Sequence, residues 1–127
     1  MTDQPVPHVT DDDVKRVAAR DFGTTQAGLA LSIVEEFGKQ DWNRPSPRIW
    51  LAILKLANGD LDRLPEITAT AIADYRDVLA WAEYPRYSRE IGFHDAPEST
   101  KQAAIDDDWK QYCRWLGRDA SDQREDA

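Results

Sequence analysis

Carboxylates are the side chains of this sequence most able to carry chemistry. Asp74 and Asp77 stand three residues apart, and aspartate fills every position from 106 to 108. On two facing helices, such groups could hold a divalent metal or act as an acid and base pair. Metal sites of this kind in helical bundles also use Glu-x-x-His motifs, and neither His8 nor His94 stands in that context. We therefore expect solvated faces and ion pairs here, and no metal or cofactor.

The other reactive side chains do not form a catalytic motif. Cys113 is the single cysteine and falls on an apolar helical stripe, which is typical of an unreactive buried thiol. His8 and His94 have no serine or cysteine nucleophile at a motif spacing. The glycines are scattered at expected helix ends and form no phosphate-binding loop. We predict no catalytic residue, although a small helical enzyme using Asp74, Asp77 and residues 106–108 remains the alternative.

A second pattern favours protein binding. In the helix expected up to Glu83, Asp74, Asp77 and Trp81 recur at spacings of three and four, which places them on one stripe that reaches Tyr84. The segment that follows concentrates tyrosine and arginine, the residue types that interfaces favour. The sequence thus predicts a candidate interface made of Asp74, Asp77, Trp81, Tyr84, Arg86 and Tyr87.

Structural explanations of the same residues stay open. Trp109 or Trp115 of the last helix could cover Trp81, because five tryptophans in a chain this short cannot all be exposed. The tyrosines could also cover the core while the arginines pair with nearby carboxylates.

Capping residues and breakers divide the chain into helices. Thr10 and the Ser46-Pro47 pair open helices, and Gly23, Gly38, Asn58-Gly59 and Gly117 end them. Asp60 is expected to cap a short turn before Pro65, and Pro85 to interrupt the chain. The expected helices are 11–22, 24–37, 47–57, 65–83 and 97–116, with an irregular connector over 84–96. The predicted fold class is all-α, a compact single-domain bundle or orthogonal array of about five helices.

The apolar periodicity predicts one core. The helix from residue 47 is apolar over more than half its circumference, which makes it the most central element. The positions expected to be largely buried are Trp50, Ile53, Leu54, Tyr75, Val78, Leu79, Trp109 and Tyr112. A flexible arm is expected over 1–10, a single domain over 11–117 and a disordered charged tail over 118–127.

Composition narrows the classes of partner. The 127 residues contain 16 Lys and Arg against 24 Asp and Glu, a formal net charge of −8. This acidity disfavours nucleic acid, whose phosphates require cationic side chains, and favours a basic protein partner. The N-terminus lacks a signal-peptide pattern, and no apolar stretch approaches membrane-spanning length, so a cytoplasmic protein is expected.

Three segments carry a resemblance to a family. The chain resembles a family of short, uncharacterised bacterial all-helical proteins in three segments. These are Leu54-Lys-Leu-Ala-Asn-Gly-Asp-Leu, the segment from Asp74 to Pro85, and Asp108-Trp-Lys-Gln-Tyr-Cys-Arg-Trp-Leu. The patterns LAxLKLxxGDL, DYRDVLxxAEYP and DWxxYxxWL extend over about residues 12–117. The resemblance implies a helical domain of bacterial origin and carries no function or site residue.

Together these observations favour a non-catalytic interaction module. In size, acidity and helicity the chain is also similar to immunity proteins, which suggests an inhibitor or immunity role as the most specific version. A structural homodimer, with Trp81 and Trp115 paired across a two-fold axis, is a further alternative.

Overall fold

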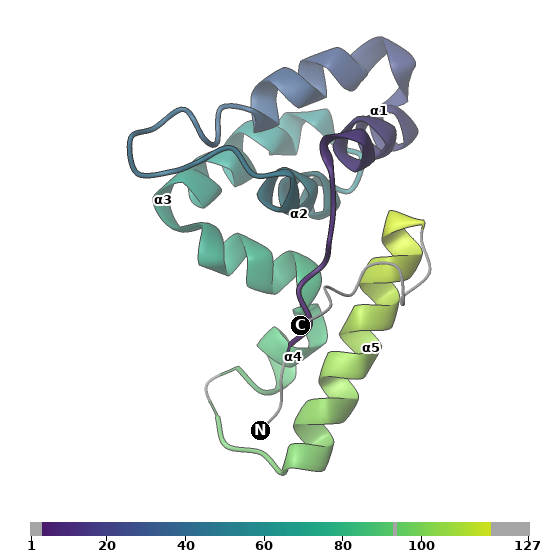
Figure 1. Ribbon diagram of the computed structural model, residues 1–127, viewed down its shortest axis with the longest axis vertical. Helices are drawn as coiled ribbons and strands as arrows, with labels where there is room; N and C mark the ends of the chain where they lie inside the picture. The colour runs from purple at the N-terminus through teal and green to yellow at the C-terminus, as the bar shows by residue number, and fades with distance from the viewer. Residues whose placement is uncertain (1–3, 93, 118–127) are drawn as a thin grey trace. The chain divides into compact units, whose positions relative to one another are not determined.

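The computed structural model describes residues 4–92 and 94–117, and the fold is all-α. Its helices are α1 (Asp11–Val34), α2 (Pro47–Ala57), the 3₁₀ turn η1 (Leu61–Arg63), α3 (Leu64–Glu83), α4 (Pro85–Glu90) and α5 (Glu98–Leu116) (Figure 1). The all-α prediction with about five helices is therefore confirmed. The predicted charged tail over 118–127 lies outside the described residues.

The chain divides into two compact units, and the boundaries fall between His8 and Val9 and between Leu79 and Ala80. We call residues 9–79 the N-terminal unit. The C-terminal unit combines the described parts of 1–8 and 80–127. That residues 11–117 form a single domain stays a prediction.

Helix α1 opens the N-terminal unit with the predicted cap. Thr10 accepts a hydrogen bond from the Asp13 amide, and Asp13 accepts one from the Thr10 amide, so the two residues form a reciprocal capping box. At Gly23 the backbone has φ 78° and ψ 156°, a conformation almost confined to glycine. The two helices predicted on either side of Gly23 thus follow one another across a sharp break, and the second ends at Val34 (Figure 1).

Helix α2 packs against α1. The Ser46 hydroxyl accepts from the Ile49 amide, Pro47 occupies the first turn, and Asn58 ends the helix in the left-handed region at φ 51°. Leu51, Ala52, Ile53 and Leu54 are fully buried in succession, as expected for the most central element.

Helix α3 contains a break that the sequence analysis did not predict. Asp74 has φ −156° and ψ 98°, and its Oδ1 accepts from the Arg76 amide at 3.1 Å, so Asp74 caps the second half of the helix. The prediction that Tyr75 is largely buried is wrong. It assumed an unbroken helix, and the non-helical backbone at Asp74 changes the direction in which the next side chain points. Tyr75 is 38% exposed, and its ring lies almost perpendicular to that of Phe37, with the two ring centroids 6.1 Å apart.

The remaining core predictions are mostly confirmed. Ile53, Leu54, Val78, Trp109 and Tyr112 are buried. Trp50 and Leu79 are only partly covered, and the Trp50 indole donates to the Phe37 carbonyl at 3.0 Å.

The C-terminal unit contains a helix where an irregular connector was expected. Helix α4 occupies residues 85–90, and it packs against α5. The connector prediction is wrong for these residues because Pro85 is compatible with the first turn of a new helix, as Pro47 is in α2. Helix α5 ends at Gly117 in the left-handed conformation, as predicted.

Candidate functional site

The six residues of the predicted interface belong to different units. Asp74 and Asp77 lie in the N-terminal unit, whereas Trp81, Tyr84, Arg86 and Tyr87 lie in the C-terminal unit.

Asp74 is engaged in the local structure of α3. Its carboxylate receives the Arg76 guanidinium through two hydrogen bonds of 3.0 Å, in addition to the Arg76 amide. These hydrogen bonds from Arg76 lower the pKa of Asp74. Asp77 is exposed to solvent, so it is available to a partner.

Trp81 is 48% exposed, which agrees with its predicted place outside the core. Tyr84, by contrast, is only 4% exposed, and its hydroxyl donates to the carbonyl of Pro5. Tyr84 is thus an internal residue that ties the N-terminal arm to its own unit, and Pro7 in the same arm is also buried. Of this pair only Trp81 presents its ring to solvent.

Arg86 and Tyr87 lie in the first turn of α4 and are partly exposed. The Arg86 guanidinium donates to Glu90 at 2.7 Å and lies 3.5 Å from Asp107, and the hydrogen bond to Glu90 is the main cause of its raised pKa. This pairing agrees with the alternative in which the connector arginines pair with nearby carboxylates. The charge of Arg86 is therefore partly neutralised within the chain, before any partner binds.

Asp108 holds α4 and α5 together. Its carboxylate accepts the Arg86 amide at 3.0 Å and the Tyr87 amide at 2.8 Å, and the side chain is 1% exposed. It therefore caps α4 from another helix, satisfying two amide groups that the first turn leaves unpaired. Burial raises the pKa of Asp108, and the hydrogen bonds from Tyr87 and Arg86 offset part of that increase.

The aspartate run of α5 is thus divided among structural contacts. Asp106 accepts from Gln102 at 2.8 Å, Asp107 lies beside Arg86, and Asp108 caps α4. Within residues 4–92 and 94–117, no three His, Cys, Asp or Glu side chains gather as a metal site would require. Cys113 is buried, as its position on the apolar stripe predicted.

Trp42 is an exposed aromatic residue that the sequence analysis left in a loop without a role. It is 73% exposed, and its indole Nε1 donates to the Ile72 carbonyl at 3.3 Å, beside a second hydrogen bond from the Asn43 amide group. The break at Asp74 comes two residues after that carbonyl. The signal that could have identified Trp42 is a tryptophan in a polar loop, with no apolar residue at helical spacing around it.

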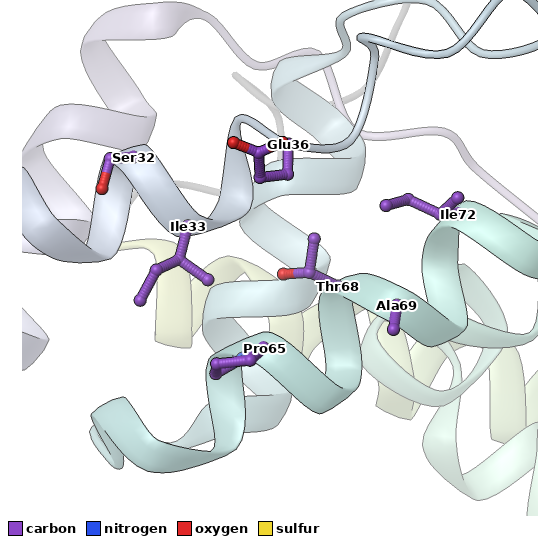
Figure 2. A pocket seen from close by; sticks show the side chains of 7 residues that line it. All are labelled: Ser32, Ile33, Glu36, Pro65, Thr68, Ala69 and Ile72. Atoms are coloured by element: carbon purple, nitrogen blue, oxygen red, sulfur yellow. The ribbon is translucent and has the colours of Figure 1, made fainter.

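A groove of about 540 Å³ lies in the same unit, between α1 and the following turn on one side and α3 on the other. Its lining residues are Ser32, Ile33, Glu36, Pro65, Thr68, Ala69 and Ile72. Figure 2 shows Thr68 extending from α3 toward Ile33 and Glu36. Ile72 belongs to this groove and also binds Trp42 through its carbonyl, so the groove and the exposed indole are neighbours.

No protein-family model, curated protein or solved structure matches this chain. The resemblance to short bacterial helical proteins therefore stays a prediction. In the part of the chain that the structure describes, no helix has both the length and the apolar character needed to cross a membrane.

Proposed function

We propose that the chain is a non-catalytic, cytoplasmic interaction module that binds a basic protein. The observation that supports this proposal best is Trp42, whose indole is held at the surface by a hydrogen bond and yet is 73% exposed.

An indole held in this way suits a binding anchor. Its hydrogen bond to Ile72 restricts the loop before a partner arrives, so less conformational entropy is lost on binding. Tryptophan buries a large apolar area and is enriched among residues that dominate interface energies. Trp42 therefore joins Trp81 as a candidate anchor, one in each unit.

Charge favours a basic partner. Asp41 precedes Trp42, and Asp77 is exposed on α3. Carboxylates near an aromatic anchor attract a cationic surface and orient it during the encounter. The net charge of −8 also disfavours nucleic acid, because its phosphates are repelled by a negatively charged protein. The most specific form of this proposal is an inhibitor or immunity-type protein that covers a basic enzyme.

The test is affinity capture from the native host with the full chain, followed by binding kinetics with the captured protein. Trp42→Ala removes an anchor, so we expect faster dissociation and a loss of about 2 kcal/mol or more in binding free energy. Trp81→Ala and Tyr87→Ala test the second unit in the same way.

Leu29→Ala is the matched control, because Leu29 is also a large apolar residue of the N-terminal unit and is 54% exposed. Its affinity should equal that of the wild type, and each variant should keep the wild-type thermal transition. Equal dissociation rates for wild type, Trp42→Ala and Trp81→Ala would refute the proposal. A dimer in light scattering that is lost in Trp81→Ala would favour the homodimer instead.

A further inference from the structure

We propose that the groove between α1 and α3 is a binding site for a small, neutral, mostly apolar molecule that carries one hydroxyl or amide group for Thr68. This inference concerns residues outside the predicted interface, and it does not depend on the existence of a protein partner.

The apolar residues that line the groove favour a ligand with an apolar body. Ile33 faces Pro65, Ala69 and Ile72 from the opposite helix (Figure 2). A volume of about 540 Å³ lies within the range of roughly 300–1,000 Å³ that small-molecule sites occupy. Such sites combine apolar walls with a small number of polar groups that orient the ligand.

Thr68 supplies the polar group. The residue is 3% exposed, and its hydroxyl has no hydrogen-bond partner among the described residues. A buried hydroxyl without a partner costs free energy, and a ligand that pairs with it recovers that cost. Binding through this hydroxyl requires a turn about the Thr68 Cα–Cβ bond, and this turn breaks no hydrogen bond because the hydroxyl has no partner among the described residues.

The other polar groups of the lining are already engaged. The Ser32 hydroxyl donates to the Leu29 carbonyl at 2.8 Å, and the Glu36 carboxylate pairs with Lys39 at 3.0 Å. A ligand with an apolar body needs only the one hydrogen bond.

The ion pair at the rim also sets the ligand's charge. Because Glu36 is matched by Lys39, neither a carboxylate nor an ammonium group on the ligand meets an unpaired opposite charge there. An ionic ligand would lose hydration in an apolar groove without compensation. A neutral alcohol or amide is therefore the class that fits.

The test uses 1-hexanol, with hexanoate and hexylammonium as charged probes of equal chain length. In the full chain, methyl NMR signals of Ile33, Thr68 and Ile72 should shift saturably with 1-hexanol, with a dissociation constant of roughly a millimolar for a probe this small. Both charged probes should bind more weakly. No saturable shift, or tighter binding of either ion, would overturn the proposal.

Substitutions at Thr68 separate the hydroxyl from the apolar walls. Thr68→Val keeps the shape but removes the hydroxyl, so 1-hexanol should bind about five-fold more weakly while the melting temperature stays equal or rises. Thr68→Ser restores the hydroxyl and should recover most of the affinity. Unchanged affinity in Thr68→Val, or a lower melting temperature, would show that the hydroxyl has another role and would overturn the assignment.

Filling the groove supplies the remaining control. Ala69 is an exposed residue of the lining, so Ala69→Phe should abolish the saturable shifts. Ala103→Phe, at an exposed position of α5, should leave them unchanged. Equal shifts in wild type and Ala69→Phe would place the probe elsewhere and reject this site.

Discussion

Both the backbone conformation and the neighbouring atoms require glycine at position 38. Its φ is 108°, and a Cβ atom added there would lie 2.7 Å from the backbone of Pro45. Gly38→Ala should therefore lower the free energy of unfolding by about 2 kcal/mol or more, which urea denaturation would measure.

Gly28 is the matched control for that substitution. It lies in α1, and an added Cβ meets no atom within 4 Å. Gly28→Ala should stabilise the chain by about 0.5–1 kcal/mol, because alanine loses less backbone entropy in a helix. Similar effects of the two substitutions would contradict the close approach of Gly38 to Pro45.

Asp108 should make stability depend on pH in a specific direction. Because burial raises its pKa, the folded chain holds the proton more tightly than the unfolded chain does. The contribution of Asp108 to the free energy of unfolding is therefore largest below about pH 4, and it falls as the pH rises through the raised pKa of this carboxyl group.

Asp108→Asn tests both the cap and this pH dependence. The amide NH₂ group cannot accept one of the two hydrogen bonds from Arg86 and Tyr87, so the variant should lose about 1–3 kcal/mol of stability. The difference from wild type, measured by urea denaturation across pH, should narrow as pH rises. A difference that widens would mean that the ionised carboxylate is the favoured form.

At the scale of elements, α2 supplies the core of the N-terminal unit. Leu54 is fully buried, so Leu54→Ala should lower the free energy of unfolding by about 2–5 kcal/mol. Leu29→Ala removes the same atoms from a site that is 54% exposed, and it should change stability by less than about 0.5 kcal/mol. Comparable losses in thermal or urea denaturation would show that Leu54 is not central.

Breaks within the helices affect which side chains are exposed to solvent. Gly23 separates two halves of α1, and Asp74 does the same in α3. The exposure of Tyr75 follows the second break, and the indole of Trp42 binds the carbonyl of Ile72 close to it. The break at Asp74 thus lies close to the carbonyl that binds Trp42, and Ile72, which supplies that carbonyl, also lines the groove.

At the scale of the whole molecule, the net charge of −8 should act on the rate of partner association. Asp77 is exposed, so Asp77→Asn should slow association with a basic partner and leave dissociation nearly unchanged. Salt screens such long-range attraction, and the difference from wild type should shrink as ionic strength rises. Association rates that are equal at low salt would exclude a steering role for this carboxylate.

The sequence by itself determined the helical class and most helix ends. Thr10, Ser46, Asn58 and Gly117 act through hydrogen bonds or backbone conformations within a few residues of themselves, so their effects can be read locally. Apolar periodicity likewise identified Ile53, since within an unbroken helix the buried face follows from spacing alone.

Tertiary structure decided the arrangement of the candidate surfaces. Asp108 caps α4 from 22 residues beyond Arg86, and Tyr84 is internal because Pro5, 79 residues earlier, accepts its hydroxyl. The exposed setting of Trp42 depends on a carbonyl 30 residues away. Contacts between residues this far apart in the chain depend on how the elements pack, and local propensity carries no information about that packing.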